Sequence, residues 1–178
     1  DLTSQQATML SKQVASGELA AQSDAQVLAT FDALQPEAIL TWARAEMNRY
    51  PEYEYSMTRQ ERLNGQWQDK PARMMIRYRH MPRQLYAKWL PNCVQAGQEI
   101  IYDETRRKDE MYGHLGGIMG FTSIWTAIDG TLAKYQSNHT VRDLGFQFVL
   151  SMLERDAKTL RAAGLSEKYS RTEIVQEQ

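Results

Sequence analysis

The residues that could bind a metal or act as a nucleophile are few in this sequence. His80, His114 and His139 lack metal-ligand spacing to one another and to the single cysteine, Cys93. Cys93 has no basic neighbour in the sequence that would lower the pKa of its thiol, so we interpret it as an inert thiol in a loop. The glycine-rich stretch 113–120 lacks the lysine of a phosphate-binding loop, and no Gly-x-Ser-x-Gly motif occurs. We therefore expect no metal site, no cofactor and no nucleophilic catalysis.

Glu61, Glu99 and His139 are the remaining candidates for acid–base catalysis. An uncharacterised enzyme that used them would need all three side chains in one cleft, within reach of a common substrate or a bridging water. The simpler interpretation is that the glutamates form ion pairs on charged strands. His139 and Asp143, four residues apart, would then stabilise the entry to a helix. The enzyme is kept as an alternative hypothesis.

A run of basic residues between Lys70 and Lys88 contains no acidic residue. We expect it to form an anion-binding face on two adjacent strands. There Arg77, Arg79 and Lys88 would meet the anionic headgroup of a lipid or an acidic protein partner. The alternative is that cross-strand glutamates neutralise these cations, namely Glu54, Glu61 and Glu99. Nucleic acid is not an expected ligand, because the net charge of the chain is −1.

Aromatic residues and methionines are concentrated in the middle of the chain. Twelve of the seventeen aromatic residues lie in 50–135, and six of the nine methionines lie in 57–119. Such side chains either fill an ordinary core or line an apolar cavity whose shape adapts to a ligand. If a cavity is present, we expect these residues to line it: Tyr55, Met57, Met74, Ile76, Tyr78, Trp89, Met111 and Trp125.

The elements that would position these residues can be read from the hydrophobic periodicity. A period of two begins at Tyr53 and predicts strands at 53–62, 74–80, 85–90, 98–103, 111–115, 121–128 and 131–136. Asn64-Gly65 predicts a tight turn. The connections are short, so an antiparallel meander is expected.

Helical periodicity flanks this region on both sides. Helices are predicted from about Ser4, from a cap at Ser23 or Asp24, and from Pro36 to a point before Pro51. A last helix is predicted over 141–163, ended by Gly164. We expect a helical arm at 1–35, a single α+β domain at 36–165 and a polar tail at 166–178.

The overall composition is that of a soluble globular protein. The chain has 178 residues, of which 42% are hydrophobic, and its mean hydropathy is −0.59. This excludes a disordered chain and a disulfide scaffold, and no apolar run is long enough to span a membrane. The sequence begins at Asp1 without an initiator methionine, so we expect an exported protein from which a signal peptide has been removed.

Two motifs carry a resemblance to a known family. They are Gly-Gln-Glu-x-x-Tyr at 97–102 and His-x-x-x-Asp-x-Gly at 139–145. Together with other residues in the same order, they resemble the bacterial domain-of-unknown-function family numbered 1571, over about residues 37–160. The other residues are Tyr55, Glu61-Arg62, Asn64-Gly65, Ile76-Arg77, Pro82 and Leu85-Tyr86. The resemblance implies an exported bacterial protein with no established activity.

The order of the elements is also similar to that of the periplasmic lipoprotein carrier LolA and its relatives. That similarity implies a curved antiparallel half-barrel packed against N-terminal and C-terminal helices, with acyl chains held between sheet and helices. Arg59 and Glu61 share a strand face with Tyr55 and Met57, so the cavity would have a charged end. A partly polar ligand would resolve this, as would an internal ion pair with Arg77 or Arg79.

The leading hypothesis is a non-enzymatic periplasmic protein of LolA-like shape. It would bind an apolar or amphipathic ligand, such as a lipid or a lipoprotein acyl group. An interaction module with flat basic strands that recruits an acidic partner is the second alternative, beside the enzyme. The sequence does not determine the oligomeric state.

Overall fold

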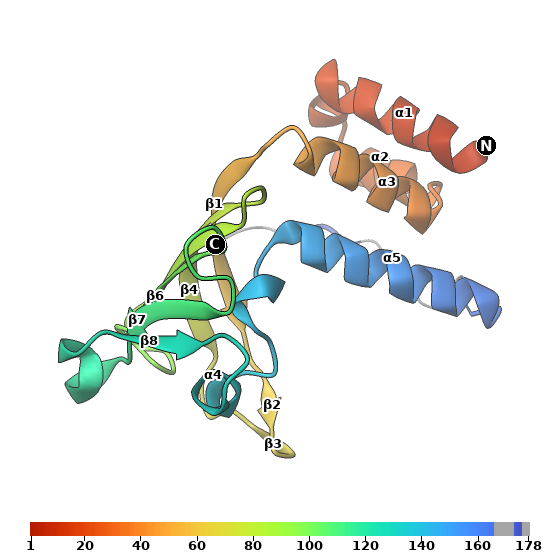
Figure 1. Ribbon diagram of the computed structural model, residues 1–178. Helices are drawn as coiled ribbons and strands as arrows, with labels where there is room; N and C mark the ends of the chain where they lie inside the picture. Colours follow the sequence, from red (N-terminus) through yellow and green to blue (C-terminus); the bar gives the residue numbers. More distant parts are fainter. Residues whose placement is uncertain (166–172, 176–178) are drawn as a thin grey trace. The chain divides into compact units, whose positions relative to one another are not determined.

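The protein has an α+β fold, which the computed structural model describes for residues 1–165 and 173–175 (Figure 1). Its α-helices are α1 (Leu2–Ala15), α2 (Asp24–Asp32), α3 (Pro36–Met47), α4 (Thr131–Gln136) and α5 (Phe146–Ala162). Short 3₁₀ helices are η1 (Leu19–Ala21), η2 (Gly117–Phe121) and η3 (Val141–Asp143). Contacts group the chain into two compact units. One joins Asp1–Arg49 with the chain from Phe146 onward, and the other is Tyr50–Gly145.

The helical unit is built around α3, which packs against both α1 and α5. The Arg44 guanidinium on α3 donates two hydrogen bonds to the Glu154 carboxylate on α5, at 2.6 and 2.9 Å. Leu10 of α1 is fully buried. The boundary expected at residue 36 therefore falls inside a packed unit, because α1 and α3 lie on either side of it. The polar tail expected at 166–178 lies mostly outside the described residues.

The ends of the helices follow local capping chemistry. Ser23 caps α2 in a capping box with Gln26, and Pro36 occupies the first turn of α3, as predicted. The cap of α1 is Asp1 rather than Ser4, because the Asp1 carboxylate accepts the Ser4 backbone N–H at 2.8 Å. Gly164 follows α5 with φ +69°, a conformation that favours glycine.

The second unit contains an open six-stranded antiparallel sheet in the order β1-β4-β5-β6-β7-β8. The strands are β1 (Glu52–Arg59), β4 (Ala72–Arg79), β5 (Gln84–Trp89), β6 (Glu99–Asp103), β7 (Glu110–His114) and β8 (Ile124–Ala127). The alternation along each strand gives the sheet a buried face, with Met74 and Ile76 fully buried, and an exposed face, with Arg77. The predicted antiparallel meander and the α+β class are confirmed.

A separate two-stranded hairpin interrupts the meander after β1. β1 ends at Arg59 rather than continuing to Arg62. β2 (Arg62–Leu63) then pairs with β3 (Gln66–Trp67) around the Asn64-Gly65 turn. Both turn residues have positive φ, at 50° and 84°, so the predicted turn is confirmed.

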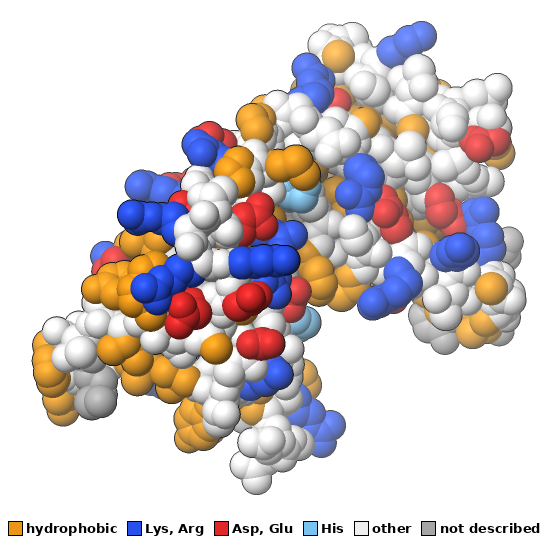
Figure 2. Space-filling view, in the orientation of Figure 1, with side chains coloured by type: hydrophobic (Ala, Val, Ile, Leu, Met, Phe, Trp, Pro, Cys, Tyr) orange, Lys and Arg blue, Asp and Glu red, His pale blue; other side chains and the backbone are white. Residues whose placement is uncertain are grey.

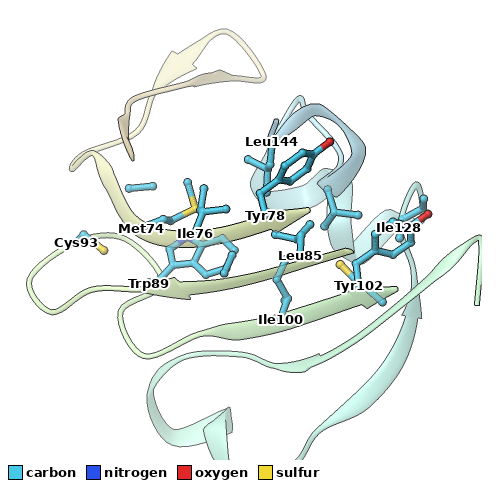
Figure 3. Close-up of a cluster of buried hydrophobic side chains, with 14 residues drawn as sticks. Met74, Ile76, Tyr78, Leu85, Trp89, Cys93, Ile100, Tyr102, Ile128 and Leu144 are labelled. Atoms are coloured by element: carbon cyan, nitrogen blue, oxygen red, sulfur yellow. The ribbon is translucent and has the colours of Figure 1, made fainter. Parts of the chain in front are cut away.

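Residues 128–145, which we call the covering segment, lie on the buried face of the sheet. Ile128, Val141 and Leu144 join the buried cluster formed by the strands (Figure 3). The Tyr55 hydroxyl on β1 donates a hydrogen bond to the Leu144 carbonyl. The sheet therefore obtains its apolar cover from within its own unit.

Three predictions about this part of the chain are wrong. Residues 131–136 form α4 and not a strand, because Thr-Leu-Ala-Lys-Tyr-Gln contains good helix formers and does not alternate. The strand predicted at 121–128 shortens to β8, because η2 takes its first residue. The helix predicted from Val141 begins at Phe146, because residues 141–143 form a separate 3₁₀ turn capped by Thr140 and Asp143.

No helix in the ranges 1–165 and 173–175 is long and apolar enough to cross a membrane.

Gly145 ends the covering segment against the ring of Tyr78. A Cβ atom at this position would lie 2.5–2.8 Å from two ring carbons and the hydroxyl oxygen of Tyr78, and Tyr78 is only 4% exposed. We expect Gly145→Ala to lower the free energy of unfolding by about 1–3 kcal/mol through overpacking, measured by urea denaturation. The same substitution in a Tyr78→Leu background should cost much less. An equal cost in both backgrounds would contradict the steric explanation.

Candidate functional site

A cavity of about 220 Å³ lies between the buried face of the sheet and the covering segment. Its walls are mostly apolar. The sheet contributes residues from β5 to β8, among them Trp89, Ile100, Met111, Gly113 and Thr126. The covering segment contributes Ile128, Leu132, Ala133, Val141 and Leu144. All of these residues belong to the Tyr50–Gly145 unit, so the cavity is a property of that unit alone.

Two of the eight residues expected to line a cavity do so, Trp89 and Met111. Five others do not line it and lie in or against the packed core beside it: Tyr55, Met57, Met74, Ile76 and Tyr78. Trp125 is also absent from the walls. It pairs with Tyr112 across β7 and β8 on the exposed face.

The sequence does not predict the part of the lining that comes from the covering segment. Its periodicity divides these residues among a strand, a turn and the start of a helix, which gives them no common face. The available signal was the cluster of apolar residues at Ile128, Leu132 and Ala133 around Asp129-Gly130. A segment with such residues but no strand periodicity can cover a sheet.

Two glycines, one in the cavity wall and one just beyond it in the chain, make close backbone approaches. Gly113 lines it, and a Cβ there would lie 2.2 Å from the Glu99 carbonyl oxygen on β6. A Cβ on Gly116 would lie 2.2 Å from the Ala96 carbonyl oxygen. At Gly113 the wall of the cavity is therefore peptide backbone.

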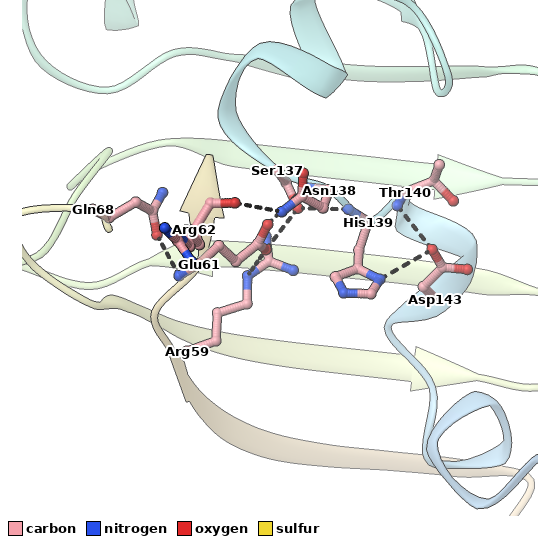
Figure 4. A network of polar contacts seen from close by, with 9 residues as sticks. All are labelled: Arg59, Glu61, Arg62, Gln68, Ser137, Asn138, His139, Thr140 and Asp143. Atoms are coloured by element: carbon pink, nitrogen blue, oxygen red, sulfur yellow. Dashed lines mark hydrogen bonds and ion pairs between the residues drawn. The ribbon is translucent and has the colours of Figure 1, made fainter. Parts of the chain in front are cut away.

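Some lining residues of the cavity belong to a polar network around Glu61, which we call the polar end (Figure 4): Arg59, Ser137, His139 and Thr140. The Glu61 carboxylate is only 8% exposed. It accepts hydrogen bonds from the Ser137 hydroxyl at 2.8 Å and from the Asn138 backbone N–H at 2.6 Å. The Arg59 guanidinium lies 3.1 Å away and forms an ion pair with it. Burial lowers the pKa of Arg59, while Glu61 and Asp143 oppose that shift.

His139 and Asp143 lie at the start of η3, where their spacing predicted a structural role. The Asp143 carboxylate accepts the Thr140 backbone N–H at 3.0 Å and lies 3.6 Å from Nδ1 of His139. Gly145, the last residue of the same motif, contacts Tyr78. In the other motif, the buried Tyr102 hydroxyl donates to the Lys108 carbonyl at 2.8 Å. Both motifs therefore contain contacts that hold the sheet and its cover in place.

Comparison with known protein families identifies the family of this chain. Residues 50–178 match the family described as Protein of unknown function (DUF1571). The chain belongs to this family. No curated protein and no solved structure matches it. The family resemblance expected from the two motifs is confirmed, and the LolA-like fold stays a prediction.

The exposed face of this DUF1571 sheet carries paired charges. Arg77 pairs with Glu54 at 2.6 Å, and Lys88 pairs with Glu99 at 3.7 Å. Arg79 pairs with Glu52. Figure 2 shows basic and acidic side chains side by side over the sheet. The alternative of cross-strand pairing thus describes these cations, with Arg59 rather than Arg77 or Arg79 as the partner of Glu61.

The three residues of the enzyme hypothesis do not converge. Glu61 and His139 lie at the polar end of the cavity, on the buried face of the sheet. Glu99 points to the exposed face, where it accepts a hydrogen bond from the Tyr86 hydroxyl at 2.7 Å. This hydrogen bond lowers the pKa of Glu99. The sheet itself separates the proposed acid–base groups.

Cys93 is buried, as an inert thiol would be. Its sulfur lies 2.9 Å from the Leu90 carbonyl oxygen and 3.1 Å from that of Val94. In the described part of the chain, no three His, Cys, Asp or Glu side chains gather as metal ligands would.

The buried pair of Arg59 and Glu61 generates a stability prediction. Glu61→Gln would remove the ion-pair partner of the Arg59 guanidinium in a largely buried site and leave it only the weaker influence of Asp143. We expect the free energy of unfolding to fall by about 3 kcal/mol. The double variant Arg59→Met/Glu61→Gln should recover part of this loss, since neither charge then remains. Urea unfolding of both variants checks this, and no recovery in the double variant would contradict it.

Burial also raises the pKa of the Tyr55 hydroxyl. A tyrosine ionises near pH 10 in an unfolded chain, so its raised pKa stabilises the native state below that pH. This contribution is lost as the pH rises above about 10 towards the folded pKa. Tyr55→Phe should therefore show a shallower alkaline decrease in stability, measured by urea midpoints between pH 8 and 11. The matched control is Tyr135→Phe, at a side chain that is 74% exposed. Equal slopes in wild type and Tyr55→Phe would contradict the prediction.

Proposed function

We propose that this DUF1571 protein binds a small apolar or amphipathic ligand in the cavity between its sheet and the covering segment. The observation that carries the proposal is the cavity itself, with about 220 Å³ of space and mostly apolar walls. An apolar protein cavity of about 150 Å³ is large enough to bind benzene. Apolar walls with a few polar groups at one end are typical of sites for small ligands.

The size of the cavity limits the ligand. Its volume of about 220 Å³ is below the range of about 300–1,000 Å³ that is usual for drug-sized ligands. A small molecule would fit whole, whereas a lipid or a lipoprotein acyl group would enter with part of its chain. The proposal includes both kinds of ligand, a small molecule bound whole and an acyl group bound by part of its chain.

The proposal is for a non-enzymatic, exported, periplasmic binding protein of LolA-like shape. An antiparallel sheet whose apolar face is covered by a segment of the same chain supports it, because such an arrangement can enclose hydrocarbon. The paired cations Arg77, Arg79 and Lys88 give no support to an anionic headgroup or an acidic partner on the exposed face. The proposal therefore relies on the cavity and not on the basic run.

A matched pair of substitutions tests the cavity. Ile100 lines it and is 6% exposed, whereas its neighbour Ile101 is 52% exposed on the opposite face. Toluene added to wild type should shift the methyl NMR signals of Ile128 and Leu144. Ile100→Trp should fill the space and abolish these shifts, while Ile101→Trp should retain them. Absence of any shift in wild type at millimolar toluene would overturn the proposal.

The natural ligand is sought by native mass spectrometry of protein purified without detergent. We expect wild type and Ile101→Trp to carry a co-purifying apolar or amphipathic molecule that Ile100→Trp lacks. If each of the three proteins shows only the mass of its own bare chain, binding of such a molecule in the cell is contradicted.

A further inference from the structure

Two polar atoms in the cavity wall have no hydrogen-bond partner among the described residues. They are Nε1 of Trp89, a donor, and Oε1 of Gln98, an acceptor. Trp89 is 5% exposed and Gln98 is 8% exposed, so both atoms are shielded from bulk water. A buried polar group without a partner is costly in a folded protein. A polar group or a water molecule bound in the cavity would satisfy both atoms.

The two side chains are neighbours on the buried face of the sheet. The Trp89 backbone N–H donates to the Gln98 carbonyl at 2.9 Å, and the Gly97 N–H donates to the Trp89 carbonyl at 3.1 Å. These bonds join the end of β5 to the start of β6. Side chains directly opposite each other across two antiparallel strands lie about 4.5–5.5 Å apart at Cβ. Continued by one residue, the register of β5 against β6 places Trp89 opposite Gln98, so both side chains belong to the same part of the cavity wall.

The chemistry of the two atoms restricts that group. It must accept a hydrogen bond from the indole N–H and donate one to the amide oxygen. A hydroxyl, an amide or a protonated carboxyl does both. A hydrocarbon does neither, and an ionised carboxylate cannot donate.

The charges at the polar end also disfavour an anion. Arg59 is the one cation with a fixed charge among the lining residues that the structure describes. Two carboxylates oppose it, Glu61 at 3.1 Å and Asp143, both of which raise its pKa. A carboxylate ligand would thus lose its hydration without gaining a free countercharge.

We propose that the cavity selects an uncharged amphipathic molecule, whose hydroxyl or amide group bridges Nε1 of Trp89 and Oε1 of Gln98. Its hydrocarbon part then lies against Ile100, Val141 and Leu144. This inference rests on the proposed function, since it names the class of ligand that the same cavity takes. It would also satisfy a donor and an acceptor that have no partner among the described residues of a mostly apolar wall.

The test compares three probes that share a ring and differ in one group: toluene, benzyl alcohol and benzoate at pH 7.5. Affinities are measured from the methyl NMR signals of Ile128 and Leu144 in wild type, Gln98→Leu and Trp89→Phe. The matched control variants are Gln66→Leu and Trp67→Phe, because Gln66 and Trp67 are of the same residue types but are exposed in β3. Methyl spectra and thermal unfolding show whether each variant is folded.

The preference for benzyl alcohol over toluene should fall about tenfold in Gln98→Leu and in Trp89→Phe. It should stay unchanged in both control variants. A change in cavity size alters the affinities for both probes, so it cancels in the ratio of the two affinities. In wild type the indole N–H proton of Trp89 should move downfield with benzyl alcohol, and benzoate should bind more weakly than benzyl alcohol.

The possible failures are distinguishable. If toluene binds but the ratio is the same in wild type and both variants, the pair holds at most a water molecule. The inference then falls while the proposed function stands. If benzoate binds more tightly than benzyl alcohol, selection for an uncharged ligand is refuted. If none of the probes binds wild type, the proposed function fails as well.

Discussion

The interaction on which the rest of the sheet unit depends is the burial of the Glu61 carboxylate. This group follows the end of β1 and is bound by Ser137 and Asn138 of the covering segment, with Arg59 as its countercharge. A buried carboxylate is tolerated only when its oxygens are satisfied in this way. Glu61 thereby fixes the covering segment over the apolar face. The Tyr55–Leu144 hydrogen bond and the buried side chains Ile128 and Val141 hold the same segment, and together these contacts enclose the cavity.

The fold could be predicted from the sequence where the local pattern and the tertiary environment agree. The strands from Tyr53 to Leu115 alternate clearly because one face is buried, and the Asn64-Gly65 turn follows from residues that tolerate positive φ. The covering segment could not be predicted in this way. Its conformation depends on contacts such as those of Tyr55 with Leu144 and of Tyr78 with Gly145, which join residues far apart in the chain.

The residues of the candidate site also divide into those whose position the sequence predicts and those whose position it does not. Trp89 and Met111 could be assigned to a cavity because they are large apolar residues on predicted strands. The face on which Trp125 lies could not be predicted correctly, because it depends on the pairing register of β8. A one-residue shift in that register moves a side chain to the opposite face of the sheet. The basic run was visible in the sequence, but its neutralisation depends on the register of β1 against β4. That register places Glu52 opposite Arg79 and Glu54 opposite Arg77.

The two close backbone approaches at Gly113 and Gly116 have a consequence for how ligand preference can vary. Any side chain at either position would overlap a carbonyl oxygen of the neighbouring backbone. Gly113 therefore cannot be replaced without moving the strands. The side chains around it can be exchanged, both on the sheet, as at Ile100, and in the covering segment, as at Leu132. Diversification of the pocket, by evolution or by engineering, is thus excluded where the wall is glycine backbone and open where it is side chain.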